Sequence, residues 1–183
     1  MKLSRAFFTV LAILLAGCQS VGSRTGLYSS PLQPGDEVIM LKALTIPSSM
    51  ARVYMQAGKT MSYGESNQYE PFCYFLLRDP LPAEQVIKPG IFVIHSTWLD
   101  EVTISVEYPV RVAALFPVGG RSPIAYQFHF KLKAADQQNI TLVCSGAFDD
   151  PLSAAPIRLP EVRRVLDGYA EVKVKTLVPP ASR

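Results

Sequence analysis

The chain has 183 residues, with 18 basic and 15 acidic side chains and a formal net charge of +3. Two of the basic residues, Lys2 and Arg5, precede an apolar run at the amino terminus, so the chain that follows this leader is almost neutral. No run of lysine and arginine is interleaved with aromatic residues, which makes nucleic acid an unexpected partner. The length that remains suits one domain with a substantial core.

The first 17 residues have the layout of a secretory signal peptide. Lys2 and Arg5 are followed by 11 uncharged residues from Ala6 to Ala16 and then by a small residue. A helix that spans a bilayer needs about 20 apolar residues, so this run is too short for a membrane span. We therefore expect residues 1–17 to be a cleaved leader.

The leader ends in Leu15-Ala16-Gly17-Cys18, which resembles the lipobox of bacterial lipoproteins. The resemblance implies that the thiol of Cys18 receives a diacylglycerol, that the leader is cut before Cys18, and that the new amino group is acylated. An ordinary signal peptide cut near Gly17, which leaves a free cysteine, is the alternative. Because Gln19 follows the cysteine in place of an aspartate, the resemblance implies a lipid anchor in the outer membrane, with the domain facing the periplasm.

Residues 18–37 are rich in serine, glycine and proline and show no apolar periodicity. This composition predicts a flexible tether that carries the lipid. Fully extended at about 3.3 Å per residue, it would reach about 60 Å. We expect a single β-rich domain over residues 38–183.

The dominant pattern after the tether is an alternation of apolar and polar residues. It is clearest in Ile124 to Lys133, which predicts a strand with one buried and one wet face. A second alternating run follows a polar turn, so the two runs predict an antiparallel hairpin. The strands that we expect are Val38 to Ile46, Arg52 to Gln56, Phe72 to Leu77, Ile91 to His95, Val102 to Glu107, Arg111 to Phe116, Ile124 to Lys133 and Ile140 to Cys144. Short strands at this spacing favour a mainly β fold, an antiparallel sandwich or a partly open barrel.

One short helix is expected near the carboxyl end. Pro160 suits a first helical position, and Glu161 suits the positive end of the helix dipole. Four apolar residues follow at helical spacing on one face: Val162, Val165, Leu166 and Tyr169. Gly168 lies near the expected end, and Ala170 to Leu177 alternates like a last edge strand.

Cys73 and Cys144 are the two cysteines other than Cys18, and an exported protein meets an oxidising compartment. Cys73 shares a strand face with Phe75, and Cys144 shares one with Leu142, so both thiols should point inward. We predict a disulfide between them, with two buried reduced thiols as the alternative. Neither cysteine lies in a CxxC motif or beside a histidine, so no metal or cofactor is expected.

The stretch from His95 to Glu101 is the one segment that gathers a base, hydroxyls, an aromatic ring and two carboxylates. No nucleophile elbow, HExxH or phosphate-binding glycine loop accompanies it. We interpret it as a strand end and turn with exposed polar residues and Trp98 packed. His129 falls on the wet face of its strand, and Gly119-Gly120 predicts a loop, so no catalytic residue is predicted.

Several short motifs resemble a family of uncharacterised lipoproteins of Gram-negative bacteria. They are the run Ala51 to Gln56 with Gly58-Lys59, the run Gln68 to Pro71 that leads into Cys73, and the distant Cys144. The likeness covers residues 50–170 and implies a shared fold and a shared disulfide. It implies no catalytic residue, because no activity is established for that family.

Two classes of function follow as hypotheses. The first is a non-enzymatic outer-membrane lipoprotein with a structural or interaction role, in contact with another envelope protein or with peptidoglycan. The second is a domain that binds a small ligand or a lipid, or a hydrolase, with a pocket near His95 to Glu101 and the loop from Pro117 to Pro123. A large apolar cavity open to solvent would favour ligand binding, whereas a filled core would count against it.

The anchor gives the first prediction. Changing Cys18→Ser removes the thiol that would carry the diacylglycerol, so labelled fatty acid should no longer enter the protein and the leader should stay uncut or be misprocessed. Cys73→Ser is the matched control, since it removes a cysteine without touching the lipobox. Label that still enters the Cys18→Ser protein would show that Cys18 is not the anchor.

Overall fold

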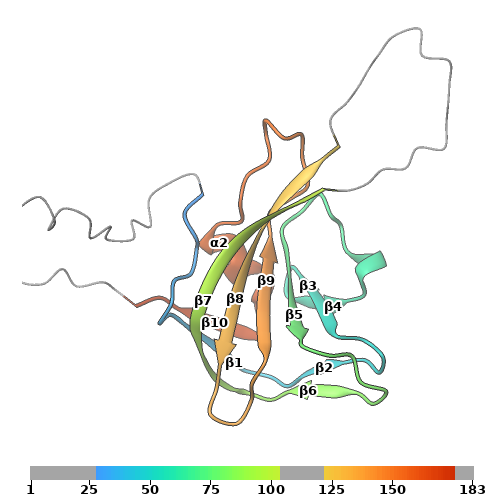
Figure 1. Ribbon diagram of the computed structural model, residues 1–183, viewed down its shortest axis with the longest axis vertical. Helices are drawn as coiled ribbons and strands as arrows, with labels where there is room; N and C mark the ends of the chain where they lie inside the picture. The colour runs from blue at the N-terminus through green and yellow to red at the C-terminus, as the bar shows by residue number, and fades with distance from the viewer. Residues whose placement is uncertain (1–27, 104–121, 176–183) are drawn as a thin grey trace, which may run out of the picture.

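The fold is built mainly from β-strands, as the alternating pattern predicts. A computed structural model describes residues 28–103 and 122–175 of the chain (Figure 1). Its elements are β1 (Glu37–Met40), β2 (Leu44–Ile46), β3 (Arg52–Gln56), β4 (Lys59–Met61), the 3-10 turn η1 (Tyr63–Glu65), β5 (Phe72–Leu77), β6 (Gln85–Ile87), β7 (Gly90–Thr103), β8 (Ile124–Lys133), β9 (Ile140–Ser145), α2 (Leu159–Leu166) and β10 (Ala170–Lys173). No helix in this described part is long and apolar enough to cross a membrane.

Eight of the strands form one antiparallel sheet in the order β10-β1-β7-β8-β9-β5-β3-β4, and β2 and β6 pair separately. The sheet curls into a half-barrel, with β7, β8 and β9 side by side along its middle (Figure 1). The open barrel, rather than the sandwich, is therefore the architecture. Three of the seven neighbouring pairs, β7–β8, β8–β9 and β3–β4, are consecutive in the chain, and the other four pair strands that are not consecutive.

Three strands, β3, β5 and β8, have the predicted bounds, and the β8–β9 hairpin is confirmed. Two predictions about strand ends are wrong. The run from Val38 to Ile46 divides into β1 and β2, which belong to different sheets. The run from Ile91 to His95 and the first two residues of the run from Val102 belong to one strand, β7, which passes a register shift at His95 without turning. The rest of the run from Val102 to Glu107 lies outside the described residues. The run from Arg111 to Phe116 lies outside the described residues.

Helix α2 closes the half-barrel. It packs against β10 at one end of the sheet and against β3 and β5 near the other end. Pro160 lies in its first turn, where Glu161 accepts a hydrogen bond from the backbone N–H of Arg158 at 2.7 Å. The helix ends before Gly168, which has φ +70°, so Tyr169 lies beyond the helix and not on its face. The predicted helix is otherwise confirmed, and β10 is the predicted edge strand, although it ends at Lys173, short of the predicted bound at Leu177.

The turn between β3 and β4 touches the end of this helix directly. The N–H of Gly58 donates to the carbonyl of Val165 at 3.1 Å. Gly58 has φ +72°, and a Cβ there would lie 3.0 Å from the carbonyl oxygen of Asp167. Glycine is required both by this backbone conformation and by the close approach of the helix.

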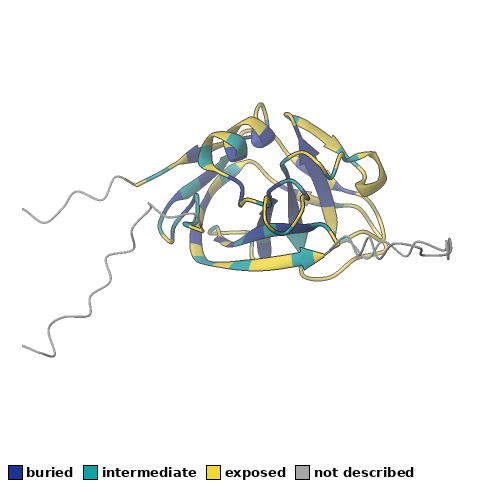
Figure 2. Ribbon diagram, turned by 90° about the horizontal axis from the view of Figure 1, so that it is seen from above, coloured by how far each residue is buried: buried dark blue, intermediate teal, exposed yellow. Residues whose placement is uncertain are grey.

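The side of the sheet that faces α2, called the first face, carries the main core. Side chains from the curled sheet, the small sheet and the helix meet there, and Figure 2 shows these buried positions enclosed by the strands. The largest fully buried members of this core are Phe75, Phe92, Phe130, Leu32, Met40, Leu44, Ile46, Met55, Ile87, Ile94 and Leu142. As predicted, Cys73 and Cys144 point into it.

The predicted disulfide joins Cys73 to Cys144. The two residues are directly opposite each other on β5 and β9, and their Cα atoms lie 4.0 Å apart. Both are completely buried. The bridge therefore links two neighbouring strands within one sheet.

The folded part begins earlier than predicted. Leu32 falls in the expected tether, yet it is completely buried in the main core. Asp36 is buried as well, and its carboxylate accepts backbone N–H groups of Gln33 and Lys175, both at 2.8 Å. The tether boundary at residue 37 is therefore wrong. A single leucine in a polar segment produces no apolar periodicity, so the pattern does not indicate that this segment packs on the core.

The disulfide gives the second prediction. Cys73→Ala should lower the free energy of unfolding by about 2 to 5 kcal/mol, because the bridge closes a long loop and removes conformational entropy from the unfolded chain. Cys144→Ala should cost a similar amount, and the double variant little more than either single one. Urea denaturation of the oxidised protein measures this. Additive losses in the double variant would contradict a shared bond.

Candidate functional site

The side of the sheet that faces away from α2, called the second face, carries a row of mostly aromatic residues. Residues directly opposite each other on antiparallel strands share a face and lie in contact distance. One such row crosses six strands, from β7 to β4, through Trp98, His129, Val143, Tyr74, Tyr54 and Met61. A second apolar cluster forms on this face around the tyrosines, with Phe72, Ala125 and Phe148.

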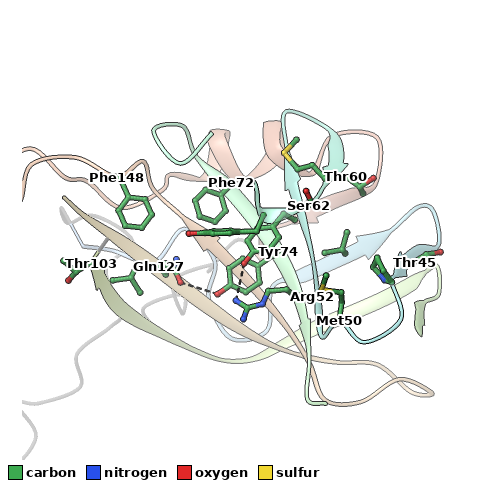
Figure 3. Close-up of a pocket in the computed structure, with 16 residues that line it drawn as sticks. Thr45, Met50, Arg52, Thr60, Ser62, Phe72, Tyr74, Thr103, Gln127 and Phe148 are labelled. Atoms are coloured by element: carbon green, nitrogen blue, oxygen red, sulfur yellow. Dashed lines mark hydrogen bonds between the residues drawn. The ribbon is translucent and has the colours of Figure 1, made fainter. Parts of the chain in front are cut away.

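A pocket of about 1000 Å³ opens on the second face beside this row (Figure 3). Its walls come from β3, β4, β5, the ends of β7 and β8, and the segments next to β2 and η1. The lining residues are Thr45, Pro47, Met50, Arg52, Val53, Tyr54, Thr60, Met61, Ser62, Tyr63, Phe72, Tyr74, Val102, Thr103, Gln127 and Phe148. The lining is thus largely apolar and aromatic, with hydroxyls and one cation among it.

The segment that carries η1 is held over the sheet by a buried amide. The side chain of Gln56 donates to the carbonyl of Asn67 at 2.8 Å and accepts from the N–H of the same residue at 3.0 Å. At the other wall, the N–H of Phe148 donates to the carbonyl of Gln68 at 2.9 Å. Tyr63, on η1, thereby lies next to Tyr54, with ring centroids 5.3 Å apart.

The floor of the pocket is formed by two buried tyrosines, and the exposed Arg52 lies beside them. The rings of Tyr54 and Tyr74 lie 5.0 Å apart. Arg52 donates from Nη1 to the hydroxyl of Tyr54 at 3.2 Å, and its guanidinium carbon lies 5.6 Å from the centre of the Tyr74 ring. The hydroxyl of Tyr74 donates to the amide oxygen of Gln127 at 3.4 Å. These contacts hold the polar groups of the floor in place.

Burial keeps both phenols neutral. It raises the pKa of Tyr54, and the nearby Arg52 only partly opposes this effect. Burial also raises the pKa of Tyr74, and the neighbouring Tyr54 adds to the shift. Each hydroxyl therefore keeps its proton at neutral pH, and since Tyr54 already accepts from Arg52, its own O–H can donate to a bound molecule.

Outside the pocket, the row ends in two stacked rings, of which Trp98 is exposed and His129 is largely buried. Trp98 stacks on His129 with centroids 4.8 Å apart and an interplanar angle of 14°. The Nε2 atom of His129 lies 3.3 Å from a carboxylate oxygen of Asp100, yet it has no hydrogen-bond partner among the described residues. Burial lowers the pKa of His129, and the charge of Asp100 opposes the shift without reversing it.

The candidate stretch from His95 to Glu101 does not form a site. It lies within strand β7, where we expected a strand end and a turn. His95 occupies the bulge, whereas Asp100 lies beside His129 on the neighbouring strand. Trp98 was expected to pack, but it is 44% exposed with one ring face on the imidazole. None of these residues lines the pocket, although Val102 and Thr103 of the same strand do.

The residues that build the pocket were missed because β8 was interpreted as having one wet face. Ala125 is completely buried and Gln127 is 9% exposed, although both alternate with the core residues. A usable signal was present in Phe72 to Leu77, which is apolar at every position. An uninterrupted apolar strand is typical of a sheet covered on both faces.

Three further predictions lie outside the described residues: the leader 1–17, lipidation of Cys18 and most of the loop from Pro117 to Pro123. In the described part, no three histidine, cysteine or acidic residues gather as metal ligands. Comparison of the chain with protein-family models, with curated proteins and with solved structures finds no match in any of the three. The function is therefore inferred from the geometry of the pocket.

The stacked pair gives the third prediction. Because the folded-state pKa of His129 lies below the ordinary value of 6.5, the unfolded chain binds this proton more strongly. The neutral ring contributes fully to the stability of the fold above pH 6.5, and this contribution should be lost as the pH falls from 6.5 toward the folded-state pKa. Trp98 is the single tryptophan, and a protonated imidazole quenches indole emission on contact. As the pH is lowered, the fluorescence of Trp98 in the folded protein should therefore decrease, with a midpoint below pH 6.5.

His129→Gln should abolish this transition, whereas His95→Gln, a change at the other histidine, should leave it in place. A midpoint above the ordinary histidine value would show that attraction to Asp100 outweighs burial. A transition that persists in the His129→Gln protein would assign the quenching to another group.

Proposed function

We propose that this protein is a non-enzymatic binding domain that takes a small amphipathic molecule into the pocket on its second face. The observation that carries the proposal is the open pocket of about 1000 Å³, formed on a sheet whose first face is filled by a complete core. Ligand sites are commonly clefts of about 300 to 1000 Å³ with apolar walls and a few polar groups. The pocket fits that description at its upper end.

The walls and floor are suited to hold a ligand in a fixed place. Phe72, Tyr74 and Tyr54 are each less than a tenth exposed, so their positions are set by the sheet and not by the occupant. Met50 and Tyr63 are 53% and 52% exposed at the opening, where they can adapt to different shapes. A rigid floor with adaptable side chains at the rim favours binding of related apolar molecules that differ in shape.

The chemistry of the lining supports binding over acid–base catalysis. The described residues that line the pocket include serine and threonine hydroxyls but no histidine, carboxylate, lysine or cysteine. A hydroxyl nucleophile needs an adjacent base within hydrogen-bond reach. Both histidines of the chain lie outside the described lining, which counts against the hydrolase hypothesis.

The proposal places this domain at the outer membrane, facing the periplasm, through the lipid on Cys18. The support for that location is the lipobox alone. A lipid-anchored domain would meet lipids and other amphipathic molecules of the envelope at short range. The remaining hypothesis is contact with an envelope protein or peptidoglycan, which becomes the stronger reading if the pocket binds nothing.

Filling the pocket gives the fourth prediction. Val102 lines it from β7, so Val102→Trp places a large ring in the pocket and should weaken saturable binding of N-phenyl-1-naphthylamine, an uncharged probe that brightens in apolar sites. Val93, on the same strand, is 38% exposed and does not line the pocket, so Val93→Trp is the matched control. Fluorescence titration measures the affinity. No saturable binding, or equal binding by all three proteins, would contradict the proposal.

A further inference from the structure

The pocket contains one charged residue among the described residues that line it, and that residue is Arg52. It begins strand β3, opposite Leu76 of β5, and its side chain lies next to Tyr74 within the pocket (Figure 3). Arg52 is exposed, and as the single cation among the described lining residues it favours an anionic ligand over a neutral or cationic one. Its position beside solvent lets a charged head stay partly hydrated while an apolar body enters the pocket.

Two contacts hold the guanidinium in place before any ligand arrives. Arg52 donates to the Tyr54 hydroxyl at 3.2 Å and lies over the Tyr74 ring at 5.6 Å. One of its five N–H donors is used in the hydrogen bond to Tyr54, which leaves donors for an oxyanion. Arginine offers these donors as a planar fork that matches carboxylate and phosphate oxygens.

The nearest acidic groups do not neutralise Arg52. Among the described residues, no carboxylate forms an ion pair with it. Glu65 is close to the pocket through Ser62, but its carboxylate accepts from the N–H and the hydroxyl of Ser62, both at 2.8 Å. These hydrogen bonds lower the pKa of Glu65 and keep it engaged at the η1 turn. Asp100 lies beside His129, and although its charge contributes to the raised pKa of Tyr74, it forms no ion pair with Arg52.

From this arrangement we infer that the natural ligand is an amphipathic anion, with its head group on Arg52 and its apolar body against Phe72, Phe148 and Val102. The inference rests on the proposed function and adds the charge of the ligand and the residue that selects it. Tyr54, whose hydroxyl oxygen accepts from Arg52, can donate a hydrogen bond from its own O–H to the same head group. The shared chemistry is one oxyanion on one apolar body, which both free fatty acids and phosphate-headed lipids provide.

The test compares three ligands with the same 12-carbon chain: dodecanoate, dodecyl phosphate and uncharged dodecanol. Each displaces N-phenyl-1-naphthylamine from the full-length protein at pH 8. At least one anion should bind about tenfold more tightly than the alcohol, or better, because hydrogen bonds to charged groups contribute more than neutral ones. Preference for dodecanoate would indicate a fatty-acid head, and preference for dodecyl phosphate would indicate a phosphate-headed lipid.

Arg52→Met removes the charge and keeps an apolar stem, so it should remove the preference for the anions and leave dodecanol affinity unchanged. Arg52→Lys keeps the charge but not the fork, and it should retain part of the preference. Arg164→Met is the matched control, because it changes the net charge equally on α2, at the opposite face of the sheet. It should bind all three ligands like the unaltered protein.

Equal affinity for the three ligands, or an anion preference that survives Arg52→Met, would overturn the inference and leave the binding function in place. Failure of all three to displace a probe that does bind in the pocket would also overturn it. If the probe itself shows no saturable binding, the proposed function fails with it. Thermal unfolding of the Arg52 variants is monitored alongside, and Arg52→Lys carries the test if Arg52→Met does not fold.

Discussion

The packing of α2 between the two ends of the curled sheet is the constraint on which the rest of the structure depends. An open sheet of eight strands exposes two edges and a wide apolar face, and it can bury that face only by curling. The helix contacts β10 near one end and β3 near the other, so one short element closes the core. Gly58 permits this closure, because its turn approaches the helix backbone directly.

Curling has a consequence for the opposite face. Because the first face is concave and packs on α2, the second face points outward. Large apolar side chains on it are shielded from solvent only where loops pack over them. The segment around η1 supplies part of that cover, held by the buried amide of Gln56. Its Tyr63 lies against Tyr54, and the open space beside them is the pocket. The site is thus the part of the second apolar cluster over which no loop packs.

The chain's local patterns predicted the elements well, since β3, β5, β8, α2 and the disulfide depend on short-range periodicity and on phase. The same patterns failed where burial depends on packing by residues that are distant in the sequence. Leu32 is a single apolar residue in a polar segment, and its burial is decided by distant strands. Nothing in the immediate surroundings of His95 shows that β7 continues through it, because the ladder with β8 keeps the strand extended across the bulge.

The pocket was harder to predict than the fold for a related reason. Its residues come from strands and loops far apart in the chain, and Arg52 and Phe148 have no local feature that connects them. The continuous apolar run in β5 indicated cover on both faces, but not that the cover would be incomplete. An alternating pattern such as that of β8 cannot distinguish a face that meets solvent from a face that meets a polar-edged pocket, since Gln127 suits both.

The disulfide and the pocket share the same strands. Cys73 lies between Phe72 and Tyr74 in the chain, and Cys144 follows Val143, so the bridge crosses the first face directly behind the floor of the pocket. A covalent link between β5 and β9 fixes the spacing of the aromatic rings on the other side, which lowers the cost of ordering them around a ligand. If the protein is exported as proposed, this bond forms only in the oxidising compartment. The floor would then become rigid where an envelope amphiphile is available to bind.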